Sequence, residues 1–146
     1  MKLYFDVCCL NRPFDDQTQD RILLESEAVK AILKHIRKGD WQWISSEVVD
    51  YEIQQTPDNE RRYRVSTIAR FSNEKILINE PIIIRADEIA KMGLDAFDAL
   101  HLACAEYAKV DVFLTTDDKL LRRIRKIERV EVRVENPLSW LREVIQ

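Results

Sequence analysis

Short apolar runs alternate with longer helical segments along nearly the whole chain, and this alternation restricts the fold more than any other feature. The predicted strands are residues 2–5, 41–44, 75–79, 111–115 and 130–134. The predicted helices are residues 17–38, Ser46 through Ile53, 57–72, a segment ending near Gly93, 96–108, 117–128 and Asn136 through Val144. Strands that alternate with helices form parallel sheets covered on both faces. The sequence therefore predicts an α/β fold with three layers, α/β/α, around a central parallel sheet of about five strands.

Length and composition are those of an ordinary globular chain. The 146 residues, 46% apolar and 34% charged, suit one domain over residues 1–146. No apolar run approaches the roughly 20 residues of a membrane span. The N-terminus becomes acidic at Asp6, too early for a signal peptide, and the three cysteines show no zinc-site spacing. We therefore expect a cytoplasmic protein with reduced thiols and no membrane partner.

The scarcity of glycine excludes two classes of function. The chain contains only Gly39 and Gly93. A Walker A loop and a dinucleotide-binding fingerprint each need several closely spaced glycines. Nucleotide binding through a glycine-rich loop is therefore excluded.

Four acidic residues stand where an isolated carboxylate is unusual. Asp6 and Asp117 directly follow predicted strands, whereas Glu52 and Asp98 lie inside amphipathic helical segments. Ligands of open α/β sheets bind beyond the carboxyl ends of the strands, so the first two acids are expected at one edge. Gathered carboxylates repel one another unless a cation neutralises them, and Mg²⁺ or Mn²⁺ prefers such oxygen ligands. The pattern indicates a divalent metal site at which a bound water attacks a phosphodiester, with Thr115 or Thr116 orienting that water.

Each acid also has a purely structural interpretation. Asp98 follows Asp95 by three residues, as a first-turn acid follows an N-cap, and Asp117 begins a predicted helix. Glu52 could pair with a neighbouring arginine. Asp6 is harder to explain in this way, because no helix is predicted to follow it directly.

Four segments, in this order and spacing, resemble the motifs of PIN-domain proteins. They are Leu3–Asp6, Ser46–Glu52, Phe97–Ala105 and Leu114–Asp117. The last two are the more specific, and the resemblance covers nearly the whole chain. It implies a PIN-like fold and a Mg²⁺- or Mn²⁺-dependent ribonuclease whose metal is held by Asp6, Glu52, Asp98 and Asp117. It also implies the toxin of a toxin–antitoxin pair, with an RNA substrate, an antitoxin partner and a homodimeric state.

The chain departs from the family pattern close to the first acid. PIN domains often carry Ser or Thr two residues after it, where this chain has Cys8. A thiol is a poor partner for the water shell of a hard ion. The alternative hypothesis is therefore a PIN-like module with weak or no catalytic activity that binds RNA or protein.

Some assignments stay open at the level of sequence. Glu47 and Asp50 compete with Glu52, although the spacing of Glu52 from the serine fits the family pattern better. Asp118 either replaces Asp117 as a metal ligand or assists it. His101 is either a general base or base-stacking residue, or a polar residue hydrogen-bonded near the site.

The charge distribution leaves nucleic-acid binding open. The net charge of −3 is unpromising for a protein that binds nucleic acid. Without the four negative charges of the proposed metal ligands, however, the sum is positive. Basic residues cluster on two predicted helices, and they are Arg61, Arg62, Arg64 and Arg70 on one, with Lys119, Arg122, Arg123, Arg125, Lys126 and Arg129 on the other. Such rows either bind phosphates or form solvated helix faces.

A homodimer would need an apolar contact surface. Trp41, Trp43 and Trp140 are bulky apolar candidates for it. Either one or more of them lies in an exposed patch, or all three belong to the core.

Overall fold

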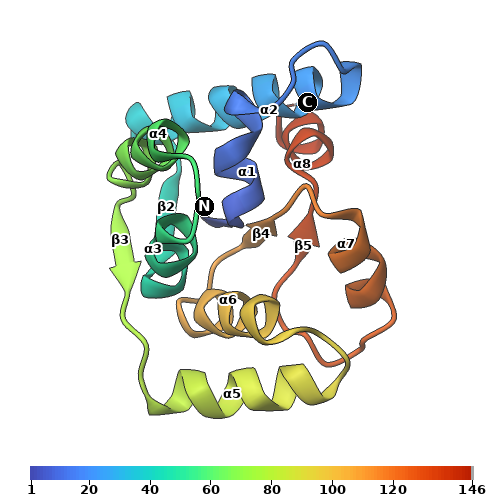
Figure 1. Ribbon diagram of the computed structural model, residues 1–146. Helices are drawn as coiled ribbons and strands as arrows, with labels where there is room; N and C mark the ends of the chain where they lie inside the picture. The colour runs from blue at the N-terminus through green and yellow to red at the C-terminus, as the bar shows by residue number, and fades with distance from the viewer. Residues whose placement is uncertain (146) are drawn as a thin grey trace.

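The computed structural model describes residues 1–145, which form an α/β fold around a sheet of five parallel strands in the order β3-β2-β1-β4-β5 (Figure 1). The strands are β1 (Lys2–Phe5), β2 (Gln42–Ser46), β3 (Glu74–Ile76), β4 (Val112–Leu114) and β5 (Val134–Glu135). The helices are α1 (Val7–Asn11), the 3-10 turn η1 (Arg12–Phe14), α2 (Asp20–Arg37), α3 (Glu47–Gln54), α4 (Asn59–Ala69), α5 (Glu80–Lys91), α6 (Ala96–Tyr107), α7 (Asp118–Arg125) and α8 (Pro137–Val144). The predicted fold class and strand number are confirmed.

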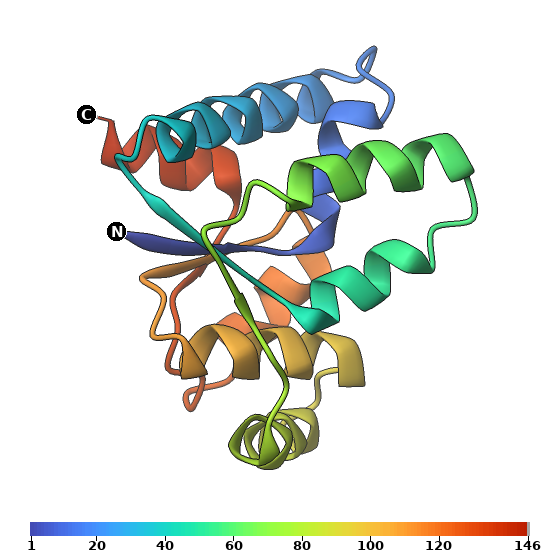
Figure 2. The same ribbon diagram turned by 90° about the vertical axis from the view of Figure 1, so that its left-hand side faces the viewer.

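Helices cover both faces of the sheet. Figures 1 and 2 show the sheet as the middle layer, with α2 and α8 on one side and α6 on the other, and α5 outside α6. α2 packs against α8, and α5 packs against α6. A parallel sheet enclosed in this way is apolar on both faces, so Leu3, Tyr4 and Phe5 are at most 1% exposed. None of the helices within residues 1–145 is long and apolar enough to cross a membrane.

The tryptophans belong to the core. Trp43 and Trp140 are buried, and Phe5 meets Trp43 edge-on at a centroid distance of 5.3 Å. Trp41 is partly buried and packs against Trp140 at 5.0 Å. The core interpretation is therefore correct for Trp43 and Trp140, whereas Trp41 lies at the margin of the core, and none of the three is among the exposed large apolar residues.

A short helix that the sequence did not predict follows β1 directly. α1 begins at Val7, and the Oδ1 atom of Asp6 accepts a hydrogen bond from the Val7 backbone N–H at 2.9 Å. The expectation that no helix follows Asp6 was wrong, because five mostly apolar residues are too few to show a helical period. Asp6 is thus an N-cap as well as a residue at a strand end.

Four strands differ from their predicted bounds, β2 and β4 by one or two residues at each end and β3 and β5 by more. β5 covers only Val134–Glu135, which pair with Phe113 and Leu114 of β4, instead of residues 130–134. Val132 is buried outside the sheet, so the alternating pattern there reflects burial of a loop. β3 covers Glu74–Ile76 rather than 75–79, because the chain leaves the sheet before Leu77.

The topology places the ends of β1 and β4 side by side. β1 lies between β2 and β4, so the chain builds the sheet outward in one direction and then in the other. Such a reversal opens a crevice beyond the carboxyl ends of the central strands. The Asp6 backbone N–H donates to the Leu114 carbonyl oxygen at 2.9 Å, so the residues after the two strands face each other.

Candidate metal centre

Asp6 is fixed in direction at the end of β1. Its Oδ1 atom accepts the Val7 N–H, and its Oδ2 atom accepts a hydrogen bond from the Thr115 hydroxyl at 2.7 Å. The residue is only 7% exposed, and this burial raises the pKa of Asp6 although the hydroxyl favours the ionised form. A cation near this poorly solvated carboxylate would therefore be stabilising.

Cys8 lies next to this carboxylate. Its Sγ atom is 3.4 Å from Asp6 Oδ2 and 3.3 Å from Thr115 Oγ1, and it accepts a hydrogen bond from the Thr116 N–H at 3.3 Å. Thr115, which was predicted to orient water, donates its hydroxyl proton to Asp6 in this structure. The hydroxyl group beside Asp6 thus comes from Thr115, the residue that directly follows β4.

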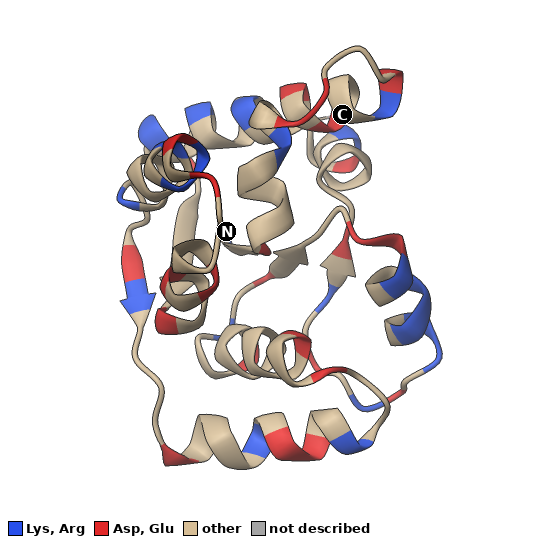
Figure 3. Ribbon diagram, in the orientation of Figure 1, with Lys and Arg blue, Asp and Glu red and all other residues tan. Residues whose placement is uncertain are grey.

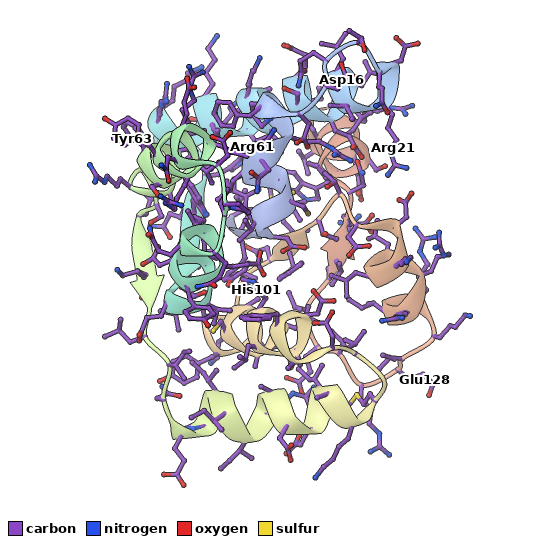
Figure 4. The ribbon with its side chains drawn as sticks, in the orientation of Figure 1. Asp16, Arg21, Arg61, Tyr63, His101 and Glu128 are labelled. Carbon is purple, nitrogen blue, oxygen red and sulfur yellow. The ribbon has the colours of Figure 1, made fainter. Side chains whose placement is uncertain are left out.

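Glu52 and His101 approach Asp6 from two helices. Glu52 lies on α3, and its Oε1 atom is 3.3 Å from Nε2 of His101 on α6, which Figure 4 labels between these helices. Candidate ligand atoms of Asp6, Glu52 and His101 all lie within 4.8 Å of one another. Among residues 1–145, Glu52 pairs with this histidine and not with an arginine. The interpretation of His101 as a hydrogen-bonded polar residue near the site is correct.

Asp98 is a first-turn acid of α6, as its structural interpretation predicted. The N-cap residue Asp95 accepts a hydrogen bond from the Asp98 backbone N–H at 2.8 Å. Burial, followed by the negative charges of Asp95, Asp6 and Asp117, raises the pKa of Asp98 to about 7. The position of Asp98 in the first turn therefore does not explain why other acids lie near it, because nearby negative charges destabilise an ionised carboxylate.

Asp117 and Asp118 have different partners. The Oδ1 atom of Asp117 accepts two backbone N–H groups at the start of α7, at 2.9 and 3.2 Å. Both oxygens of Asp118 accept hydrogen bonds from the guanidinium of Arg21 on α2, at 2.5 and 2.7 Å. Figure 4 labels Arg21 on the side of the molecule where α7 begins. This geometry favours Asp117 as the ligand and gives Asp118 a structural ion pair.

The other two acids of α3 face β3 and the segment after it. Glu47 accepts the Ile78 backbone N–H at 2.9 Å, and Asp50 pairs with Lys75 at 3.0 Å. Glu52 is the acid of this helix that belongs to the group around Asp6. The geometry thus favours Glu52 over its two rivals.

The donor set suits a hard divalent cation. Asp6, Glu52, Asp98 and Asp117 offer carboxylate oxygens, which Mg²⁺ and Mn²⁺ prefer. Burial raises the pKa values of Asp6 and Asp98, so both carboxylates are costly to ionise without a counter-charge. The residues present therefore fit the metal that the sequence predicts.

Tyr4 and Ser46 are polar groups of the site that sequence reasoning missed. The Tyr4 hydroxyl lies 2.7 Å from His101 Nδ1 and 2.6 Å from Ser46 Oγ. In sequence, Tyr4 is simply one of the apolar residues of a strand. Only the packing of β1 against α6 reveals its polar contact.

A parallel α/β sheet with an acidic edge beyond its central strands defines a class of proteins suited to metal-dependent chemistry. A family model described as the PIN domain matches residues 20–127, and the chain therefore belongs to the PIN domain family. Asp6 precedes the matched segment, and the pairing of β1 with β4 brings it to the site. No curated protein matched the sequence.

Three solved structures share the fold. FitAcB from Neisseria gonorrhoeae has a TM-score of 0.62 at 16% identity, covering 92% of this chain and 97% of that chain. VapBC2 from Rickettsia felis, bound to a DNA fragment from its promoter, has a TM-score of 0.58 at 15% identity, covering 93% and 98%. VapBC-1 from nontypeable Haemophilus influenzae has a TM-score of 0.60 at 15% identity, covering 94% and 98%. At these identities the likeness establishes the PIN-like fold alone.

Proposed function

We propose that this protein is a Mg²⁺- or Mn²⁺-dependent endoribonuclease. The observation that carries the proposal is the gathering of carboxylates at the carboxyl edge of the sheet, where candidate ligand atoms of Asp6 and Glu52 lie within 4.8 Å of each other and the charges of Asp6 and Asp117 act on Asp98. PIN domain membership supports it, because proteins of this family are typically nucleases. A cytoplasmic location, where RNA is available, is part of this proposal.

The carboxylates of Asp6, Glu52, Asp98 and Asp117 would hold the ion, directly or through water. When bound, such an ion supplies an activated water and offsets the charge that develops on the phosphodiester. The Thr115 hydroxyl keeps one oxygen of Asp6 in place, and the backbone at the start of α7 does the same for Asp117.

The positive charge on the surface of α7 is consistent with the proposal of a polyanionic substrate. Figure 3 shows basic residues along this helix, which begins directly after Asp117. The exposed cations of this segment form no ion pair within the described part of the chain, and they are Lys119, Arg122, Arg123 and Arg125 on the helix, with Lys126 and Arg129 after it. In the α4 set, in contrast, Arg61 and Arg64 are paired with Asp15 and Glu60, and Arg62 donates to the Thr56 carbonyl and to Asn59, so within the described residues only Arg70 has a guanidinium without such a contact. We therefore assign phosphate contacts to α7 rather than to α4.

Cleavage of a mixed RNA pool in the presence of Mn²⁺ tests the enzymatic proposal. We expect endonucleolytic products that disappear when excess EDTA removes the metal, and that return when Mn²⁺ is restored. Cleavage that persists in excess chelator would falsify the metal-dependent mechanism.

The alternative function is a PIN module that binds RNA or protein with little or no cleavage, and Cys8 motivates it. Because the thiol touches both Asp6 and Thr115, Cys8→Ser would place a hydroxyl in the same contacts. For a nuclease that the thiol impairs, we expect Cys8→Ser to raise the cleavage rate several-fold, while Cys8→Ala does not. A silent wild type together with a silent serine variant, both of which retain RNA binding, would instead support the binding module.

The likeness to FitAcB, VapBC2 and VapBC-1 supports a narrower proposal, that the protein is the toxin of a toxin–antitoxin pair. An unrestrained ribonuclease harms its host, so an antitoxin that covers the acidic site is the partner expected. Expression of the chain should slow growth, and co-expression of a short adjacent gene that encodes the antitoxin should restore it. If overexpression leaves growth and bulk RNA unchanged, the toxin role is wrong, while the metal site can still stand.

A homodimer is also part of the proposal. Apolar side chains at the end of β3 and on α5 are at least 37% exposed, and they are Leu77, Ile78, Ile83 and Ile84. Burying them against a second copy would stabilise a dimer. Light scattering across a wide concentration range measures this, and a monomer at every concentration would contradict it.

A further inference from the structure

A chain of hydrogen bonds links the start of α3 to Glu52 through the core. Ser46 Oγ lies 2.6 Å from the Tyr4 hydroxyl, which lies 2.7 Å from His101 Nδ1. The other ring nitrogen, His101 Nε2, lies 3.3 Å from Glu52 Oε1. Ser46 and Tyr4 are fully buried and His101 is 1% exposed, so their protons are shared within the chain rather than with solvent.

With a neutral imidazole, these hydrogen bonds admit two proton orders, whereas an imidazolium would donate from both nitrogens and would also leave Nε2 protonated. Ser46 is the N-cap of α3, and its Oγ atom already accepts the Val49 N–H at 3.2 Å. In the first order, Ser46 donates to Tyr4, Tyr4 donates to His101 Nδ1, and the Nε2–H group donates to Glu52. In the reverse order, the Nδ1–H group donates to Tyr4, and the lone pair of Nε2 faces a carboxylate oxygen. Two acceptors at 3.3 Å repel each other, so the first order is favoured.

We propose that His101 is a positioning residue that holds Glu52 through its Nε2–H group and is not itself a ligand of the metal. Distance alone would admit the histidine as a ligand, because its candidate atom lies within 4.8 Å of those of Asp6 and Glu52. The Tyr4 hydroxyl decides between the roles, since donation to Nδ1 leaves Nε2 protonated and unable to bind a cation. This inference rests on the proposed metal site and deepens it.

The Tyr4 hydroxyl, at the centre of these hydrogen bonds, belongs to a ring that is held firmly by its neighbours. The Tyr4 ring stacks on Phe113 of β4 at a centroid distance of 5.2 Å and meets the His101 ring edge-on at 5.8 Å. The orientation of Glu52, a partly exposed residue of α3, is thereby tied to the two central strands. Loss of the Tyr4 hydroxyl should loosen Glu52 without removing a carboxylate.

Nitrogen-15 NMR of the imidazole groups measures the proton order directly. We expect His101 to be the Nε2–H tautomer in the metal-free protein and to remain so in saturating Mg²⁺. His35, the other histidine of the chain, lies on α2 and serves as an internal reference. An Nδ1–H tautomer, or a large change in the Nε2 resonance of His101 on addition of Mg²⁺, would overturn the proposal.

Calorimetric titration with Mg²⁺ tests the positioning role without RNA. We expect Tyr4→Phe to raise the apparent dissociation constant about tenfold, as loss of a supporting hydrogen bond at a metal site does. The matched control is Tyr107→Phe, which removes the hydroxyl of an exposed tyrosine on α6 and should leave the constant unchanged. His101→Gln, which keeps an N–H donor, should bind Mg²⁺ more tightly than His101→Leu.

The outcomes separate this inference from the proposed function. Equal loss of Mg²⁺ binding in both His101 variants, with wild-type affinity in Tyr4→Phe, would make the histidine a ligand and overturn the positioning role. If wild-type protein binds no Mg²⁺ at all, the metal site itself is wrong and the role fails with it, whichever tautomer NMR shows. If Tyr4→Phe does not fold, the tautomer of wild-type His101 in saturating Mg²⁺ decides.

Discussion

Replacement of Asp98 by asparagine should make the metal-free protein more stable and nearly abolish cleavage. The loss of one anionic ligand removes several kcal/mol of charge stabilisation from a metal-dependent transition state. Each 1.36 kcal/mol corresponds to a tenfold change in rate, so we expect a decrease of at least about a hundredfold. RNA cleavage in Mn²⁺ measures the loss of activity, and thermal unfolding in excess EDTA measures the gain in stability.

The gain in stability follows from the raised pKa of Asp98. Burial, and then the charges of Asp95, Asp6 and Asp117, raise this pKa to about 7. In the folded protein the carboxyl group keeps its proton after the unfolded chain has lost it, so metal-free stability falls between about pH 4 and about pH 7. Asparagine does not ionise, and the advantage of the variant should grow over this range and then level off. Because Asp98 is partly exposed, we discount the effect to about 1 kcal/mol, or a few degrees in Tm.

Asp87→Asn is the matched control for Asp98→Asn. Asp87 is an exposed residue of α5 that pairs with Lys91, so its replacement should change stability and cleavage very little. Lower stability of Asp98→Asn at neutral pH in EDTA, or cleavage at the wild-type rate, would show that the acids do not form one electrostatically coupled site.

Most of the fold could be predicted from local patterns in the sequence. Gly39 directly follows the predicted helix 17–38, and in the structure it lies just after α2 with a φ of +85°, the left-handed conformation that favours glycine at helix ends. The sequence predicts Asp6 and Asp117 at one edge because each lies beyond the end of a strand, and the parallel pairing of β1 with β4 agrees with this. These inferences needed only the residues of each segment and the order of the segments.

Features that depend on contacts between distant residues could not be predicted. Tyr4 is 97 residues from His101, and nothing within its strand distinguishes a tyrosine that donates to a histidine from one that simply packs. Glu25 likewise lies within an amphipathic helix, where an acidic residue is ordinarily solvated. Its partners Arg12 and Asn136 are 13 and 111 residues away. Burial of such a group becomes plausible only once these partners are known.

Glu25→Ala should produce a large loss of stability. Glu25 is 1% exposed, and its Oε1 atom accepts a hydrogen bond from Arg12 Nε at 2.9 Å. Its Oε2 atom accepts hydrogen bonds from Arg21 at 3.3 Å and from the side-chain amide of Asn136, the N-cap of α8, at 2.5 Å. Arg12 keeps its pair with Asp15 and Arg21 keeps Asp118, but the Asn136 amide loses its acceptor and both guanidinium groups lose one, which costs about 2–3 kcal/mol. For a chain of this size that lowers Tm by roughly 6–10 °C.

Glu27→Ala is the control on the same helix, because Glu27 makes only an exposed pair with Lys30 at 3.5 Å and should cost about 1 kcal/mol or less. The loss at Glu25 should also reach the metal centre. Arg21 bonds both Glu25 and Asp118, so the carboxylate network supports the start of α7, where Asp117 is held. We therefore expect Glu25→Ala to lower stability and cleavage together, whereas Asp98→Asn moves them in opposite directions. Equal unfolding midpoints for the two glutamate variants in urea would mean that the buried network does not stabilise the fold.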